Sequence, residues 1–191
     1  NATQVDILLQ DKASDATVQA KTISGFFAHL DVDGLGPGNI KRLIDAGYNT
    51  VAKIIALSET DLLQAEGFKE KLAHKIYTNI HQQLTKASLP ELMHASNIFG
   101  RGFGTKKMKL ILDAYPTVLT DPTSTTKKIQ QISQVEGLAQ KTAEQFVKEI
   151  PAFLNFLHTA NLSEKLAPPT APAPSTQAPS APSAQINTAH P

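Results

Sequence analysis

Apolar residues recur at helical spacing through most of the chain. Leu72, Ile76, Ile80 and Leu84 follow one another at intervals of four, which is the apolar stripe of an amphipathic helix. The alternation of apolar and polar residues that marks a half-buried strand is nearly absent, and residues 5–9 are the one short stretch compatible with a strand. We therefore expect an all-α fold.

Capping residues and helix breakers divide this pattern into separate helices. Ser58 with Asp61, and Ser88 with Glu91, have the spacing of a capping box, in which side chain and backbone bond reciprocally at a helix start. The other expected N-caps are Thr105 and Thr126, and the expected helix stops are Gly47 and Pro116.

Four short glycine-centred turns punctuate the helices at nearly constant spacing. Their first glycines lie 33, 35 and 35 residues apart, at Gly34, Gly67, Gly102 and Gly137. Each is entered by a charged residue and followed by a large apolar one; the apolar residues are Leu35, Phe68, Phe103 and Leu138. The regular spacing indicates an internal repeat.

The repeat is a duplicated pair of turns. The first turn and the helix after it align with the third by a shift of 68 residues, and the second aligns with the fourth by a shift of 70. Ile40 and Asp45, for example, align with Met108 and Asp113. We therefore expect two blocks of about 70 residues, each with two helix–turn–helix corners.

Such a corner can bind an anion. Glycine permits positive φ and places no Cβ between the backbone and an approaching phosphate. The unpaired N–H groups and the dipole at the start of the second helix favour negative charge. The apolar turn residue should point back between the helices and lock the corner. The candidate residues for binding a phosphate backbone are Gly34, Gly36, Gly38, Lys41, Arg42, Gly67, Lys69, Lys71, Arg101, Gly102, Gly104, Thr105, Lys106, Lys107, Gly137, Lys141 and Thr142.

These turns resemble the helix-hairpin-helix motif of many DNA repair and replication proteins, over roughly residues 21–157. The resemblance implies a grip on the duplex backbone, from the minor-groove side, without reading base sequence. The second and fourth turns have Lys69 and Ala139 in place of the second glycine, so their hold on phosphate is expected to be weaker. A protein-interaction scaffold of the SAM type is an alternative, because a glycine turn between two helices can be only a corner.

The four-turn arrangement is most similar to the corresponding domain of NAD-dependent DNA ligases. The segments that carry the likeness are Phe26-Phe27 before residues 30–36, Leu62-Leu63 before residues 66–68, and residues 136–138 with 141–143. The resemblance implies double-stranded, nicked DNA and adjoining ligase domains as partners. It places NAD in a separate catalytic domain, with no cofactor in this chain. A free-standing helix-hairpin-helix DNA-binding or packaging protein is the other alternative.

Composition refines this interpretation. The chain has no Cys and therefore no thiolate zinc site. Bacterial ligases of the family carry a four-Cys zinc finger before the first hairpin, whereas those of some large DNA viruses are similar to this chain in lacking it, which favours a viral-type member.

Apolar runs are too short to span a bilayer and no signal-peptide pattern opens the chain, so we expect an intracellular protein (nucleus, cytoplasm or viral factory) without membrane contact.

Charge is distributed unevenly although the formal net charge is only +1. Residues 101–150 carry eight Lys or Arg against five acidic residues, whereas residues 31–86 carry seven of each. We therefore expect the second block to contribute more of the charge-driven affinity for DNA.

No catalytic or metal site is expected. Adenylyl transfer needs a nucleophilic Lys in a Lys-x-Asp-Gly string, and the nearest string has Asp31 at that position. A helix-hairpin-helix glycosylase or lyase would need a Lys and an Asp flanking a base pocket, and four hairpins without an extra helical domain argue against it. His74 and His81 lie on one helix face without a carboxylate to complete a metal site. In related hairpins the turn carbonyls can hold a monovalent cation, which would fall at residues 34–36 and 102–104.

The expected organisation has three parts. Residues 1–20 would be the exit from a preceding domain, an oligonucleotide-binding barrel if the ligase resemblance holds. Residues 21–160 form the DNA-binding domain. Residues 161–191 are rich in Pro, Ala and Ser, and should be a disordered tail or linker.

Overall fold

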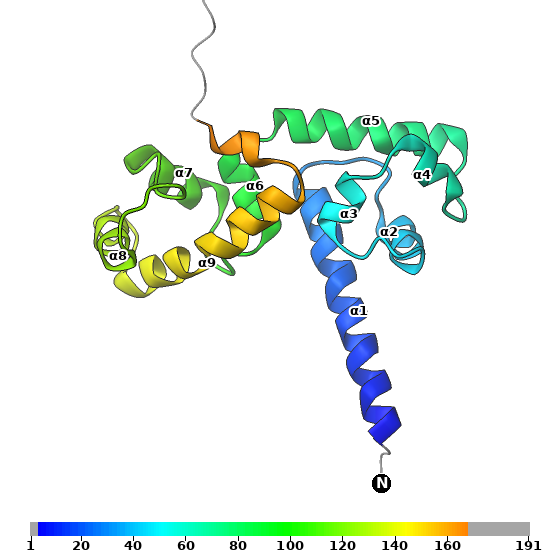
Figure 1. Ribbon diagram of the computed structural model, residues 1–191, viewed down its shortest axis with the longest axis horizontal. Coiled ribbons are helices and arrows are strands. Elements are labelled where there is room, and N and C mark those ends of the chain that lie inside the picture. The colour runs from blue at the N-terminus through cyan, green and yellow to red at the C-terminus, as the bar shows by residue number, and fades with distance from the viewer. Residues whose placement is uncertain (1–3, 168–191) are drawn as a thin grey trace, which may run out of the picture.

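The computed structural model describes the backbone of residues 4–167 and the side chains of residues 15–167. Within residues 4–167 the chain forms nine α-helices and one short 3₁₀ helix, with no strand, which confirms the all-α expectation (Figure 1). The helices are α1 (Gln4–His29), α2 (Pro37–Asp45), α3 (Val51–Ile55), α4 (Glu59–Gln64), α5 (Glu70–Lys86), α6 (Leu89–Ser96), α7 (Thr105–Ala114), α8 (Thr125–Ser133), α9 (Gln140–Thr159) and η1 (Ser163–Leu166).

The duplication appears as two blocks of hairpins. In block one (α1–α5), hairpin 1 joins α1 to α2 and hairpin 2 joins α4 to α5. In block two (α6–α9), hairpin 3 joins α6 to α7 and hairpin 4 joins α8 to α9. Figure 1 shows α2–α5 on one side of the molecule, α7–α9 on the other, and α1 extending away from the body with its N-terminal end.

The two blocks share one hydrophobic core. Phe26 and Phe27 of α1 are fully buried, and the Phe26 ring meets Phe156 of α9 with a centroid distance of 5.7 Å. α1 also packs against α6, and only two residues separate the end of α5 from the start of α6. The blocks are therefore joined both by apolar packing and by a short covalent connection.

Helix starts follow the sequence pattern only in part. Both predicted capping boxes are present, Ser58–Asp61 at α4 and Ser88–Glu91 at α6. The two threonine caps were wrong. Thr105 is already the first residue of α7 and Thr126 lies inside α8, and the N-cap residues are Gly104 and Ser124. A hydroxyl near a helix start caps it only when its backbone is still extended, and Ser124 satisfies this condition.

The expected helix stops lie where helices end. Gly47 follows α2 with a φ of 97°, a left-handed conformation that glycine adopts without strain. Pro116 lies just after α7.

The N-terminal segment differs from its expected form. Residues 5–9 are not a strand; they lie in α1, which continues without a break past the expected boundary at residue 20. Residues 4–24 contain neither Pro nor Gly, so nothing in the sequence interrupts the helix before Gly25.

The folded part also extends beyond the expected boundary at residue 160. Leu162 is buried, and Nζ of Lys165 in η1 donates to the carbonyls of Thr85 (3.0 Å) and Ala87 (2.9 Å) at the end of α5. A basic side chain on the last carbonyls of a helix stabilises that terminus. The rest of the expected tail, residues 168–191, lies outside the described residues.

Candidate nucleic-acid interface

The four hairpin turns share one backbone geometry. The first glycine of each turn has positive φ: 91° at Gly34, 84° at Gly67, 91° at Gly102 and 80° at Gly137. The apolar residues that follow them are at most 6% exposed; they are Leu35, Phe68, Phe103 and Leu138. The turns are therefore equivalent corners, each locked by one buried side chain, as the spacing predicts.

The second glycine has a different role from the first. Gly36 and Gly104 have φ of −70° and −76°, a region open to every residue, so positive φ is not the reason for glycine at these positions. Lys69 and Ala139 occupy the same N-cap position with nearly the same backbone, φ −98° and −77°. A Cβ at Gly36 or Gly104 would meet no atom within 4 Å, so both positions leave space over the helix start.

The helices that follow the turns differ from the other helices in how they begin. No side chain caps α2, α5, α7 or α9. In contrast, α3, α4, α6 and α8 each begin with a Ser or Thr whose side chain accepts a backbone N–H; these residues are Thr50, Ser58, Ser88 and Ser124. Unpaired N–H groups therefore gather at the exits of the four turns.

The free donors can be located along each of these helices. The first N–H bonded within the helix belongs to Ile40, Ala73, Met108 and Ala143, each donating to the N-cap carbonyl. The three residues before each of these have no earlier helical carbonyl to reach. Such a cluster of N–H groups at the positive end of a helix dipole favours an anion, such as a phosphate oxygen.

Cations surround the turns, and some of them are paired. Lys41 and Lys109, at equivalent positions of α2 and α7, each form a 2.6 Å ion pair with the aspartate four residues later. Nη1 of Arg42 donates to Oδ1 of Asn39 (3.2 Å), and a Cβ at Gly67 would lie 2.9 Å from the same guanidinium nitrogen. Arg42 of hairpin 1 therefore lies against the turn of hairpin 2.

Other candidate cations are free for a ligand. Within residues 15–167 the exposed side chains of Lys69, Lys71, Arg101, Lys106 and Lys141 form no ion pair. Lys69 and Lys71 line a shallow hollow over the start of α5, together with Gly67, Glu70 and Leu72.

Several of the remaining candidates lie at the helix starts. Nζ of Lys107 lies 5.7 Å from the centre of the Phe103 ring, a cation–π distance. Gly38, Thr105 and Thr142 fall within the first three residues of α2, α7 and α9.

Three residues that sequence reasoning missed hold the turns in place. Lys75 of α5 pairs with Asp33 of hairpin 1 (2.6 Å), and Nε2 of Gln145 donates to the carbonyl of Phe99 in hairpin 3 (2.7 Å). Lys75 and Gln145 are equivalent under the 70-residue shift, which is the signal that could have found them. Nδ1 of His94 donates to the Phe103 carbonyl (3.0 Å).

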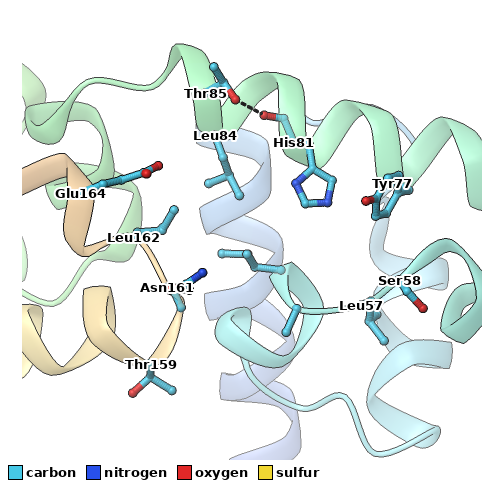
Figure 2. Close-up of a pocket in the computed structure, with 13 residues that line it drawn as sticks. Leu57, Ser58, Tyr77, His81, Leu84, Thr85, Thr159, Asn161, Leu162 and Glu164 are labelled. Atoms are coloured by element: carbon cyan, nitrogen blue, oxygen red, sulfur yellow. Dashed lines mark hydrogen bonds between the residues drawn. The ribbon is translucent and has the colours of Figure 1, made fainter.

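A separate cleft of about 510 Å³ lies between α3, α5 and the end of α9 (Figure 2). Its wall includes Leu57, Leu84 and Leu162 with the polar side chains of His81 and Glu164. None of the residues that line it belongs to a hairpin turn, so the cleft is not part of the candidate interface.

His74 and His81 have different partners. His74 contacts Glu59 (3.2 Å), whereas the His81 ring packs edge-on against Tyr77. Among the residues whose side chains are described, no group of three or more His, Asp or Glu could hold a metal ion.

None of the helices in the described part of the chain has the length and apolar character of a membrane span.

Part of the chain is similar to a known protein family. Residues 28–80, which include hairpins 1 and 2, match the family model described as a SAM-like helix-hairpin-helix tandem. This region is similar to that family, and the internal duplication repeats its sequence pattern in hairpins 3 and 4.

Most of the chain is also similar to viral DNA ligases. It is 39% identical over 166 residues to a DNA ligase of Acanthamoeba polyphaga mimivirus, covering 86% of this chain and 26% of that protein. It is 32% identical over 140 residues to a candidate DNA ligase of Invertebrate iridescent virus 3, covering 73% of this chain and 16% of that protein. The chain therefore spans about a quarter or less of each relative.

Proposed function

We propose that this chain binds duplex DNA through its backbone phosphates, without reading base sequence, as the DNA-clamping and non-catalytic part of a DNA ligase. The observation that carries the proposal is the contrast between helix starts. The four helices that leave a hairpin turn have no side-chain cap, whereas α3, α4, α6 and α8 each have one.

The proposed contact follows from this geometry. A phosphate oxygen at a turn accepts hydrogen bonds from the free N–H groups at the start of the second helix, while nearby Lys or Arg side chains neutralise its charge. Such contacts go to the sugar–phosphate backbone and carry no direct information about base sequence. Two hairpins in each block allow the domain to engage the duplex at several phosphates.

The ligase context rests on the relatives. The mimivirus protein is named as a DNA ligase, and this chain matches about a quarter of its length. The adenylyl-transfer chemistry would belong to a separate catalytic domain that binds NAD, and the helix-hairpin-helix part would hold nicked double-stranded DNA for it. A stand-alone DNA-binding protein is the alternative if no such domain accompanies the chain.

Salt-dependent DNA binding tests the proposal. Fluorescence anisotropy of the full chain with labelled duplexes of unrelated sequence, intact and nicked, should give similar affinities for the different sequences. The logarithm of the affinity should fall linearly with the logarithm of the salt concentration. Replacing Lys106 and Lys107 with Ala should reduce the salt slope by roughly one to two.

A double variant with the same charge loss serves as the control. Lys21→Ala with Lys86→Ala removes two exposed cations from α1 and the end of α5, away from all four turns. Its slope should stay close to that of the parent. A parent chain that fails to bind DNA at low salt would support the protein-interaction scaffold instead.

A further inference from the structure

Hairpins 1 and 3 have the same backbone and opposite charge. Their turns and the starts of their second helices are residues 33–39 and 101–107, which align by the 68-residue shift. Asp33 is the only charged residue in the first segment, whereas Arg101, Lys106 and Lys107 are all cationic in the second. The turn glycines nevertheless have the same φ of 91°.

In hairpin 1 a carboxylate already lies at the turn. Oδ2 of Asp33 lies 2.6 Å from Nζ of Lys75, so the nearest cation of α5 is engaged within the protein. The hydrogen bond and charge of Lys75 lower the pKa of Asp33 below its ordinary value of 3.8, and a bond from the Gly34 N–H adds to the lowering. Asp33 is therefore an ionised, exposed carboxylate that takes a donor of the turn and repels an approaching phosphate.

Hairpin 1 also offers fewer donors. The first residue of α2 is Pro37, which has no N–H, whereas the equivalent first residue of α7 is Thr105. The side chain of Asn39 donates to the Gly34 carbonyl (2.8 Å), whereas Nζ of the equivalent Lys107 lies beside the Phe103 ring.

In hairpin 3 the turn is held without an ion pair. Gln145, the equivalent of Lys75, bonds the Phe99 carbonyl with a neutral amide. Arg101, the equivalent of Asp33, is exposed and forms no ion pair within residues 15–167. The cation of this turn is therefore available to a ligand.

Hairpins 2 and 4 lie between these extremes. In residues 66–72 two lysines are balanced by Glu66 and Glu70, and in residues 136–142 Lys141 is balanced by Glu136. Hairpin 3 is the one turn of the four whose segment carries a net positive charge.

We propose that hairpin 3 is the principal phosphate contact of the domain, with Arg101 as its central cation, and that the Asp33–Lys75 pair keeps hairpin 1 a weak one. The proposal rests on the proposed function, and it means that the four hairpins differ in their affinity for phosphate. A duplex would be held first at block two, and hairpin 1 would serve mainly to join α1 to α2.

Two charge-neutralising variants of the full chain test this ranking in the anisotropy assay. Arg101→Gln should weaken binding about tenfold, as expected when a charge-assisted hydrogen bond is lost. Asp33→Asn should tighten binding about threefold, because the turn loses its negative charge and Lys75 is released. Each has a matched control, Lys86→Gln for the first and Asp15→Asn for the second, with the same change of net charge at an exposed site away from the turns. The controls should change affinity by less than about twofold, since distant surface charges are screened.

The outcomes separate the two proposals. If the parent chain does not bind DNA, the proposed function fails. If the parent binds with the expected salt dependence but Arg101→Gln equals Lys86→Gln, the ranking of the hairpins fails alone. The ranking is also overturned if Asp33→Asn binds no more tightly than Asp15→Asn. The Arg101 variant breaks no ion pair among residues 15–167, so that comparison stays decisive even if Asp33→Asn loses stability.

Discussion

Blocks one and two build the same corner with different buried side chains. At hairpin 1 two buried positions are aliphatic, Leu35 in the turn and Ile76 on α5. Around hairpin 3 the equivalent positions are Phe103 and Phe146, and their rings form a cluster with Phe99 in which centroids lie 4.8–6.2 Å apart. Since Gly34 and Gly102 still share a φ of 91°, the corner needs only a turn glycine and an apolar side chain that fills it.

The equivalent core positions provide the strongest test of this comparison. Ile76 and Phe146 are fully buried. Phe146→Ala should destabilise the fold by about 3–5 kcal/mol and Ile76→Ala by about 2–5 kcal/mol, because both leave cavities in a packed core. Urea unfolding followed by circular dichroism measures both free energies of unfolding. A loss below about 1 kcal/mol for either variant would mean that its block does not depend on that side chain.

Ala substitutions at Gly34 and Gly102, which have equal φ, distinguish the cost of backbone strain from the cost of a steric clash. A Cβ at Gly102 would meet no atom within 4 Å, so Gly102→Ala should cost only the left-handed backbone, about 1–2 kcal/mol. A Cβ at Gly34 would lie 2.8 Å from Cγ1 of Ile76, so Gly34→Ala adds a steric clash to the same strain. Thermal unfolding should therefore rank Gly34→Ala as the less stable variant, and equal losses would contradict the close approach of hairpin 1 to α5.

Acid should lower the free energy of unfolding of the domain, with a smaller effect than the core and glycine substitutions above. The Ser58 hydroxyl and N–H lower the pKa of Asp61 in block one, and the Ser88 N–H and hydroxyl lower the pKa of Glu91 in block two. A carboxyl group with a lowered folded pKa stabilises the fold above its unfolded pKa, here near 3.8 and 4.5, and this contribution is lost as the pH falls through the folded value.

Urea midpoints measured between about pH 6 and pH 3 test this effect. Stability should decline as the pH falls below about 4.5, and less steeply in Ser58→Ala and Ser88→Ala, which lack the capping hydroxyls. Ser88→Ala should itself cost about 1 kcal/mol at neutral pH. Identical pH profiles for the parent and both variants would show that the capping boxes do not produce the acid sensitivity.

The repeat made most of the fold predictable. The four turns, the buried residue in each and the two capping boxes follow from local patterns that recur at fixed shifts. The start of α1 could not be predicted from local patterns, because residues 4–20 have weak periodicity and only the lack of helix-breaking residues indicates a helix. The docking of η1 depends on Lys165 reaching carbonyls about 80 residues earlier in the chain, and no local pattern encodes such a contact.

The candidate interface was predictable as a set of residue types but not in its detail. Glycine, Lys and Arg near the turns could be named from the sequence, and they remain predictions as DNA contacts. Which cations are paired depends on distances between helices, as in the Asp33–Lys75 pair. The distinct roles of the first and second glycines depend on φ, which residue identity does not fix.

The short connection between α5 and α6 has a consequence for avidity. Since two residues join the helices and α1 packs on α6, block one has little freedom to move away from block two. A duplex held at hairpin 3, as proposed above, would therefore meet the remaining hairpins at a high effective concentration, as in a bivalent ligand with a stiff linker. Individually weak contacts can then add up to firm retention, and each can still exchange quickly enough for the domain to move along the DNA.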